Sequence, residues 1–145
     1  MPNLQTIKTT LEIGDLRTLK TYFSHLEDAN LIHSLHKATK KLNRLEAPLK
    51  VYLENTNQLY GISPEAPDKG TVRETFFFNA VSQKHNVRGL GGGDFLVDGR
   101  FLFEVGGKNK DFNQIKSKKN AFLACDEIEQ GIGARIPLWL FGFLY

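Results

Sequence analysis

The stretch that decides the fold reads Asp94-Phe-Leu-Val-Asp-Gly-Arg-Phe-Leu-Phe-Glu-Val105, with an aspartate-glycine pair between two alternating apolar runs. This pattern is typical of a β-hairpin that turns at Asp98 and Gly99. A two-residue turn would send Asp94 and Glu104 to opposite faces. A three-residue loop ending at Arg100, with a bulge, would place Asp94 directly across from Glu104. We favour the longer loop because it collects one wholly apolar face: Phe95, Val97, Phe101, Phe103 and Val105.

In this register the opposite face carries two carboxylates, Asp94 and Glu104. Side chains directly across from each other on neighbouring strands have Cβ atoms about 4.5–5.5 Å apart. Two carboxylates at that separation repel each other unless one is protonated or a cation lies between them. Mg²⁺ is commonly bound by one or two carboxylates together with water and substrate phosphates. The pair is therefore either a metal site or two charged groups at the solvated edge of a sheet.

The surrounding residues predict an α/β fold, with a mixed sheet flanked by helices over residues 61–145. A loop over 61–69 opens this region, and a glycine-rich loop is expected over 89–93. The expected helices are 70–84, with Thr71 as a cap and Glu74 at capping-box spacing, and a shorter helix near 111–119. The expected strands are 94–97, 101–105, 121–125 and 136–144.

Residues 1–60 predict a smaller unit. Residues 15–29 have the spacing of an amphipathic helix with Asp15 as its N-cap. Strands are expected over 31–35 and 49–53, joined by a basic turn that contains Lys37, Lys40, Lys41 and Arg44. Helix, strand, basic turn and strand form the back half of a winged helix. The front half would need two more helices and only 14 residues precede Asp15, so the unit is either incomplete or packed onto another element.

The composition predicts a cytoplasmic protein. The chain has 145 residues, of which 41% are hydrophobic and 24% charged, close to the average of globular domains. Cys125 is the only cysteine, so no intrachain disulfide can form, and the polar N-terminus has no signal-like apolar region. The most apolar stretch, 136–145, is far shorter than the roughly 20 residues that span a bilayer, so no membrane association is expected.

Positive charge gathers in one segment, although the net charge is only +3. Such a cluster is usually a solvated face, and the alternative is a strip that contacts phosphates. Its lysines are opposed only by Asp111, and they are Lys108, Lys110, Lys116, Lys118 and Lys119.

The hairpin resembles the Asp…Glu-X-Lys hairpin of PD-(D/E)XK nucleases. Three further segments look like the C-terminal domain of a large family of prokaryotic AAA-type ATPases, in which a winged helix links the ATPase module to a nuclease-like domain. These segments are Lys50-Val-Tyr-Leu-Glu-Asn-Thr-Asn, Gly70-Thr-Val-Arg-Glu-Thr-Phe-Phe and Ile136-Pro-Leu-Trp-Leu-Phe-Gly-Phe-Leu-Tyr145. The resemblance runs from about residue 15 to Tyr145. It implies a restriction-endonuclease-like domain preceded by part of a winged helix, with nucleic acid and a separate ATPase module or partner chain as partners.

The resemblance also implies roles for individual residues. Asp94, Glu104 and the Val105 carbonyl would bind Mg²⁺. Glu74 matches an acidic position on the preceding helix, and Gln114 matches a polar position near the phosphate. The nucleic-acid backbone would be contacted by Lys110, Lys116, Lys118 and Lys119.

No Walker A motif occurs in the sequence, because Gly91-Gly92-Gly93 is followed by Asp94 rather than by Gly-Lys-Ser/Thr. We therefore expect no ATP site and no ATPase activity from this chain alone.

One position departs from the nuclease pattern. Glu-X-Lys would place lysine at 106, where the chain has Gly106. Lys108 is the nearest substitute, and on an unbulged strand it would share a face with Glu104 but stand one pleat too far out. Three hypotheses stay open: a nuclease-fold domain that binds nucleic acid and retains Mg²⁺-dependent cleavage only if Lys108 reaches the carboxylates, a non-catalytic interaction or regulatory module of an ATPase, and DNA recognition by the partial winged helix. The position of the Lys108 amine relative to Asp94 and Glu104 separates the first two.

Overall fold

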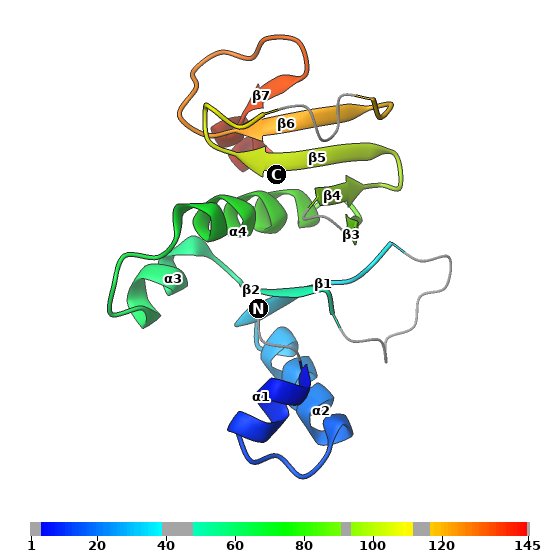
Figure 1. Cartoon of the computed structure of the whole chain (residues 1–145), viewed down its shortest axis with the longest axis vertical. Coiled ribbons are helices and arrows are strands. Elements are labelled where there is room, and N and C mark those ends of the chain that lie inside the picture. Colours follow the sequence, from blue (N-terminus) through cyan, green and yellow to red (C-terminus); the bar gives the residue numbers. More distant parts are fainter. Residues whose placement is uncertain (1–3, 39–47, 91–93, 112–116, 145) are drawn as a thin grey trace.

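The computed structural model describes residues 4–38, 48–90, 94–111 and 117–144, and these residues form a mixed α/β protein (Figure 1). This confirms the expected fold class. They contain a two-stranded antiparallel sheet of β1 (Ile32–Leu35) and β2 (Lys50–Leu53), and a five-stranded sheet in the order β3-β4-β5-β6-β7. The strands of the larger sheet are β3 (Val87–Leu90), β4 (Asp94–Val97), β5 (Phe101–Gly106), β6 (Ala121–Cys125) and β7 (Arg135–Pro137).

In the larger sheet, β4 runs opposite to the other four strands. β3, β4 and β5 pair antiparallel, whereas β6 runs parallel to β5 and β7 runs parallel to β6. A parallel neighbour cannot be reached through a tight turn, so residues 107–120 form a crossover connection from the end of β5 to the start of β6. This connection contains the lysine cluster, from Lys108 to Lys119.

The turn of the hairpin fixes which side chains share a face. Asp98 and Gly99 both have left-handed backbone angles, with φ of 52° and 65°, and the Arg100 N–H donates to the Val97 carbonyl at 3.0 Å. Val97 nevertheless pairs with Phe101, so Arg100 is an extra, bulged residue. The three-residue loop is therefore confirmed. The expected apolar face is confirmed as well, because Phe95 and Val97 are buried in the main core, with Phe101, Phe103 and Val105 packed against it.

Asp98 also anchors the turn to the chain before β3. Its carboxylate accepts a hydrogen bond from the Asn86 N–H at 2.9 Å and lies 2.7 Å from the His85 Nδ1. Its own N–H donates to the Asn86 carbonyl at 2.8 Å. The Asn86 N–H, followed by the His85 ring, holds the pKa of Asp98 below its ordinary value of 3.8. The ionised carboxylate thus helps to fix the hairpin register.

The helix α4 (Lys69–Ser82) lies between the two sheets (Figure 1). Phe77 is fully buried against Phe95 and Phe103 of the large sheet. Phe78 packs on Tyr52 of β2 and on the His33 ring of β1. A helix with partners on two sides must be apolar on two sides, which explains the run of three phenylalanines at 76–78.

In the N-terminal half, the described residues include the helices α1 (Leu4–Thr10), α2 (Leu16–Asp28) and α3 (Thr56–Ile62). The expected helix over 15–29 and its cap are confirmed, because Asp15 accepts from the Thr18 N–H at 2.8 Å. The strands expected over 31–35 and 49–53 correspond to β1 and β2. Side chains from both sides of residue 60, such as Tyr52 and Phe77, share one core cluster. The division into 1–60 and 61–145 stays a prediction.

The C-terminal segment differs from its expectation. A strand over 136–144 is wrong beyond Pro137, because β7 ends there and residues Leu138–Phe143 form a 3₁₀ helix, η1. Proline has no N–H to continue the sheet, and its fixed φ suits the residue that precedes a helix. Leu138 and Phe141 of this short helix face the core.

Three smaller expectations also need correction. The cap of α4 is Asp68 rather than Thr71, since the Asp68 carboxylate accepts from the Thr71 N–H at 2.8 Å. Residues Gly89 and Leu90 belong to β3 rather than to a loop, and 91–93 lie outside the described residues. Of the helix expected near 111–119, residues 112–116 also lie outside them, and 117–120 form turns. No helix within the described ranges has both the length and the apolar character needed to cross a membrane.

Asp98→Asn should make the protein less stable at pH 7, and the difference from wild type should close as the pH falls. A carboxyl group with a lowered folded-state pKa stabilises the fold above its unfolded pKa, and this contribution is lost as the pH drops through the folded value. Urea unfolding at pH 7 and at stepwise lower pH, beginning near 4, measures the gap. Asp28→Asn, which removes the same charge at the end of α2, is the control. A gap that stays constant to pH 2 would contradict this role of Asp98.

Candidate functional site

Glu104 is the buried acidic residue of the large sheet. It lies on β5 between Leu102 and Gly106, all three on the face opposite the Phe103 core, and pairs with Leu123 of β6. Only 4% of its surface is exposed. A carboxylate in such surroundings loses its hydration, so it needs a partner of opposite charge or a proton.

Lys110 supplies that partner. Its Nζ lies 2.8 Å from the Glu104 Oε1, while the lysine side chain itself remains 39% exposed. The backbone around it is fixed twice: the Lys110 N–H donates to the Gly107 carbonyl at 2.9 Å, and Arg135 of β7 donates to the carbonyls of Lys108 and Lys110, both at 2.9 Å. The loop that leaves β5 therefore returns a lysine to the strand it has just left.

Gly106 makes this return possible. A Cβ at position 106 would stand 2.6 Å from the Lys110 Cγ and 2.7 Å from its Cβ, so the stem of Lys110 occupies the space of the missing side chain. A lysine at 106 and the observed position of Lys110 exclude each other. The ammonium group that the Glu-X-Lys pattern would place two residues after Glu104 comes instead from six residues after it.

The second oxygen of Glu104 is exceptional. Oε2 is buried and makes no hydrogen bond to any of the described residues. An ionised oxygen without a donor or cation is costly in such a place. This oxygen is therefore the point of the site at which a proton, water molecule or cation would be held.

The register carries the other predicted ligand toward this point. The pairing of β4 with β5 ends at Phe95 and Phe103, and the same register continued by one residue would place Asp94 opposite Glu104. The Asp94 side chain lies outside the described part of the structure. Among the side chains that are described, no three His, Cys, Asp or Glu residues cluster in a way that could hold a metal. The side chain of Val105 faces the main core, and metal binding by its carbonyl stays a prediction.

The predicted lysines separate into two groups. Lys108 is exposed in the turn after β5, and Lys110, predicted to contact nucleic acid, is the residue that reaches Glu104. Lys118 and Lys119 are exposed before β6. Lys116 and Gln114 lie outside the described residues. Sequence spacing pointed to Lys108 because it follows strand geometry, but β5 ends at Gly106 and that geometry ends with it.

Glu74 belongs to a different cluster. It projects from α4 toward β2, where its Oε2 accepts from Lys50 Nζ at 2.8 Å and from the Tyr52 hydroxyl at 2.7 Å. Burial, reinforced by the neighbouring Glu74 carboxylate, raises the pKa of Tyr52. Since α4 covers the apolar face of the sheet and Glu104 faces the other side, the structure does not bring Glu74 into contact with Glu104.

An ion-pair network that the sequence did not reveal borders the site at Gly107. Arg73 of α4 donates from Nε to Asp126 at 2.8 Å and from Nη2 to Glu127 at 3.3 Å. A Cβ on Gly107 would lie 3.1 Å from the same guanidinium. The network joins α4 to the end of β6, next to the start of the crossover. Its members are 53 and 54 residues apart in sequence, so no local pattern could predict it.

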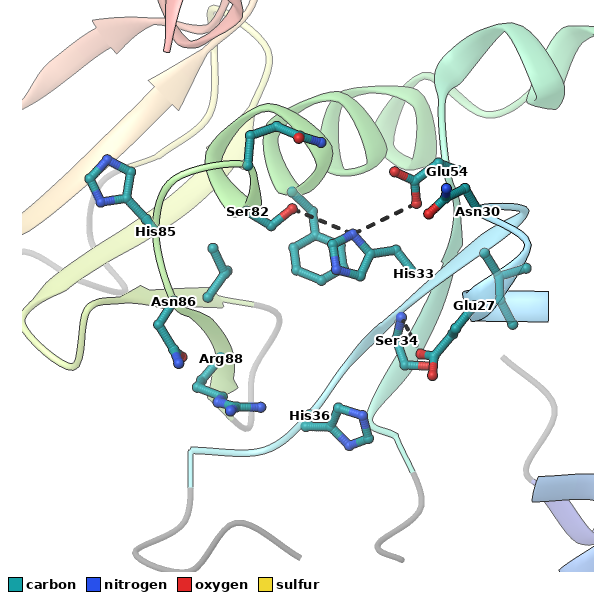
Figure 2. A pocket seen from close by; sticks show the side chains of 14 residues that line it. Glu27, Asn30, His33, Ser34, His36, Glu54, Ser82, His85, Asn86 and Arg88 are labelled. Carbon is teal, nitrogen blue, oxygen red and sulfur yellow. Dashed lines mark hydrogen bonds and ion pairs between the residues drawn. The ribbon is translucent and has the colours of Figure 1, made fainter. Parts of the chain in front are cut away.

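A second polar site lies between β1 and β3, in a pocket of about 560 Å³. Figure 2 shows Ser82, His33 and Glu54 converging there, with the His33 Nδ1 3.4 Å from the Ser82 Oγ and 3.9 Å from the Glu54 Oε2. In a catalytic triad the serine and the acid engage different ring nitrogens. Here both approach Nδ1, so this arrangement is not that of a serine hydrolase.

Lys110→Met should destabilise the protein by about 2 kcal/mol, somewhat less than the cost of breaking a fully buried pair, because it leaves the Glu104 carboxylate without its cation. Combining it with Glu104→Gln should recover part of the loss, since no buried charge then remains. Lys108→Met is the matched control and should stay within about 0.5 kcal/mol of wild type. Denaturant unfolding of the four proteins decides the matter, and equal effects of the two lysine changes would argue against the pair.

No family model, curated protein or solved structure matches this chain.

Proposed function

We propose that the chain is the C-terminal nuclease-like domain of an AAA-type ATP-binding protein and that it binds nucleic acid over the Glu104 face of the large sheet. The observation that carries the proposal is the Glu104–Lys110 pair. A buried carboxylate with a lysine on one oxygen and no partner among the described residues on the other has the composition of a phosphodiester-processing site. The exposed Lys118 and Lys119 lie on the same crossover connection and would add phosphate contacts.

The arrangement of elements agrees with the finer fold in this proposal. A restriction-endonuclease-like domain is a mixed sheet flanked by helices, and the sheet β3 to β7 with α4 on one face is compatible with it. The sequence α1, α2, β1, β2 is compatible with the tail of a winged helix, with α1 as one of the two additional helices. Both assignments support a domain that acts beside an ATPase module outside this chain.

Cleavage is the chemistry that the same residues would support. Mg²⁺ would be held by the Glu104 Oε2 and Asp94, together with the Val105 carbonyl, and when bound it would supply an activated water and charge stabilisation at a scissile phosphate. Lys110 holds the Glu104 carboxylate in place through Oε1, which leaves Oε2 to face the ligand.

A second candidate function is a non-catalytic interaction module of an ATPase. Two observations favour it: the Glu104–Lys110 pair is already closed on one side, and η1 exposes large apolar side chains. Trp139 is 51% exposed and Phe143 is 61% exposed, and the centroids of their rings lie 6.0 Å apart. Exposed apolar residues gathered in one short segment suit contact with another protein.

If the site binds Mg²⁺, the metal should stabilise the folded chain by about 2.7 kcal/mol at one hundred times the dissociation constant. Asp94→Asn and Glu104→Gln should each remove the gain, because a single carboxylate rarely holds hydrated Mg²⁺ without substrate phosphates. Thermal melts with and without Mg²⁺ measure this effect, and a supercoiled-plasmid nicking assay reports cleavage. Binding of DNA with metal-independent melting and no nicking would leave the interaction module as the function.

Moving the lysine tests whether Lys110 replaces the missing residue of the motif. Lys110→Ala alone should abolish any Mg²⁺-dependent nicking. The double variant Gly106→Lys/Lys110→Ala should restore part of it, because removal of the Lys110 stem opens the space for a side chain at 106. Gly106→Lys with Lys110 retained should be less stable than Lys110→Ala and than the double variant, since the two lysine stems would occupy the same space. Undiminished nicking in Lys110→Ala would remove Lys110 from the mechanism.

A further inference from the structure

The pocket between β1 and β3 has a cationic end. Arg88 of β3 and His36, just after β1, both line it, and the Gly89 N–H donates to the His36 carbonyl at 2.8 Å, which ties the two segments together. Neither side chain has a hydrogen bond or ion pair with the described residues. Figure 2 shows the Arg88 guanidinium and the His36 ring at the same end of the pocket. A guanidinium without a carboxylate partner is well suited to a phosphate group, which it can bind through two parallel hydrogen bonds.

The middle of the pocket offers an aromatic surface. One face of the His33 ring packs on Phe78, with 4.3 Å between centroids and 30° between planes. The Nδ1 of His33 is oriented by Ser82 and Glu54, and the side chain remains 35% exposed. Because Phe78 supports it from one side, the ring is held as a platform on which a planar group can stack.

The pocket also contains acceptors that a simple anion would not use. The Glu54 Oε1 accepts from Asn79 at 3.2 Å, whereas the Oε2 lies 3.9 Å from the His33 Nδ1. The side-chain amides of Asn30 and Asn86 line the same space. A carboxylate repels an inorganic anion but accepts from exocyclic amino groups, as carboxylates do when they read a base edge. The ligand should therefore combine an anionic group with a planar ring that carries donors.

We propose that this pocket holds one unpaired nucleotide of a nucleic-acid strand, with its phosphate at Arg88 and His36, its base on His33 and its donor edge toward Glu54. The inference rests on the proposed function, because the strand is the one that the domain binds. The nucleotide must be unpaired, since a base within a duplex presents neither a free face nor a free pairing edge. The pocket would thus give the domain a preference for junctions between duplex and single strand.

Fluorescence anisotropy with two labelled DNAs tests this proposal: a blunt duplex and the same duplex with a short single-stranded overhang. Wild type should bind the overhang DNA roughly ten times more tightly, in keeping with the stacking of a single base. Arg88→Gln and His33→Ala should each abolish that preference and leave the blunt-duplex affinity unchanged. His33→Phe retains a ring and should keep most of the preference. Circular dichroism confirms that each variant is folded.

The control is Arg17→Gln, which removes an exposed arginine at the N-terminal end of α2, the end away from the pocket residue Glu27. This change should alter neither affinity. Equal wild-type affinity for the two DNAs would overturn the pocket assignment and leave nucleic-acid binding intact. An equal loss of affinity for both DNAs in Arg88→Gln would also overturn it, because it would reduce Arg88 to a general phosphate contact. Absence of binding to either DNA would overturn the proposed function itself, and the pocket inference with it.

Discussion

The position of α4 between two sheets is the constraint on which the rest of the structure depends. Phe77 and Phe78 are neighbours in sequence and so point about 100° apart around the helix. One packs on Phe95 and Phe103, and the other on Tyr52 and His33. The same helix therefore covers one face of the large sheet with one side and packs on the β1–β2 sheet with another side. Both polar sites described above are consequences: Glu104 is turned to the uncovered face, and the Ser82–His33 contact forms where α4 meets β1.

The bulged turn between β4 and β5 decides which side chains of these strands face α4 and which face away from it. With Arg100 bulged out, the phenylalanines of β4 and β5 face α4, and every second residue faces away from it. Without the bulge, Glu104 would be directed into the apolar core, where no cation reaches. The hydrogen bonds that the Asp98 carboxylate accepts from the Asn86 N–H and shares with the His85 Nδ1 thus matter for the site, although they lie at the opposite end of the strands.

The hairpin, its register and the helix capped by Asp15 could be predicted because each depends on the spacing of residues that are close together in the sequence. The helix α3 and the 3₁₀ helix η1 were not predicted. The helix α3 is short and buries none of its residues, so no buried apolar face marks it, whereas η1 is a short segment that places Leu138 and Phe141 in the core. Lys110 was recognised in the sequence as part of a basic segment, but its contact with Glu104 was not. Strand periodicity applies only up to Gly106, and the path of the chain beyond it is decided by Arg135, 25 residues away from Lys110.

A lysine delivered from a loop differs physically from one held on a strand. A strand residue is fixed by the ladder, whereas a loop residue must be ordered at a cost in backbone and side-chain entropy. The two hydrogen bonds from Arg135 to the carbonyls of Lys108 and Lys110 supply that ordering. Because Gly106 has no side chain, the stem of Lys110 can pass over it to reach Glu104. Glycine at 106 is therefore compatible with a functioning carboxylate–lysine pair, provided that Lys110 and Arg135 are both present. The Glu104–Lys110 pair therefore depends on a contact between residues far apart in sequence, and β7 contributes to it through Arg135.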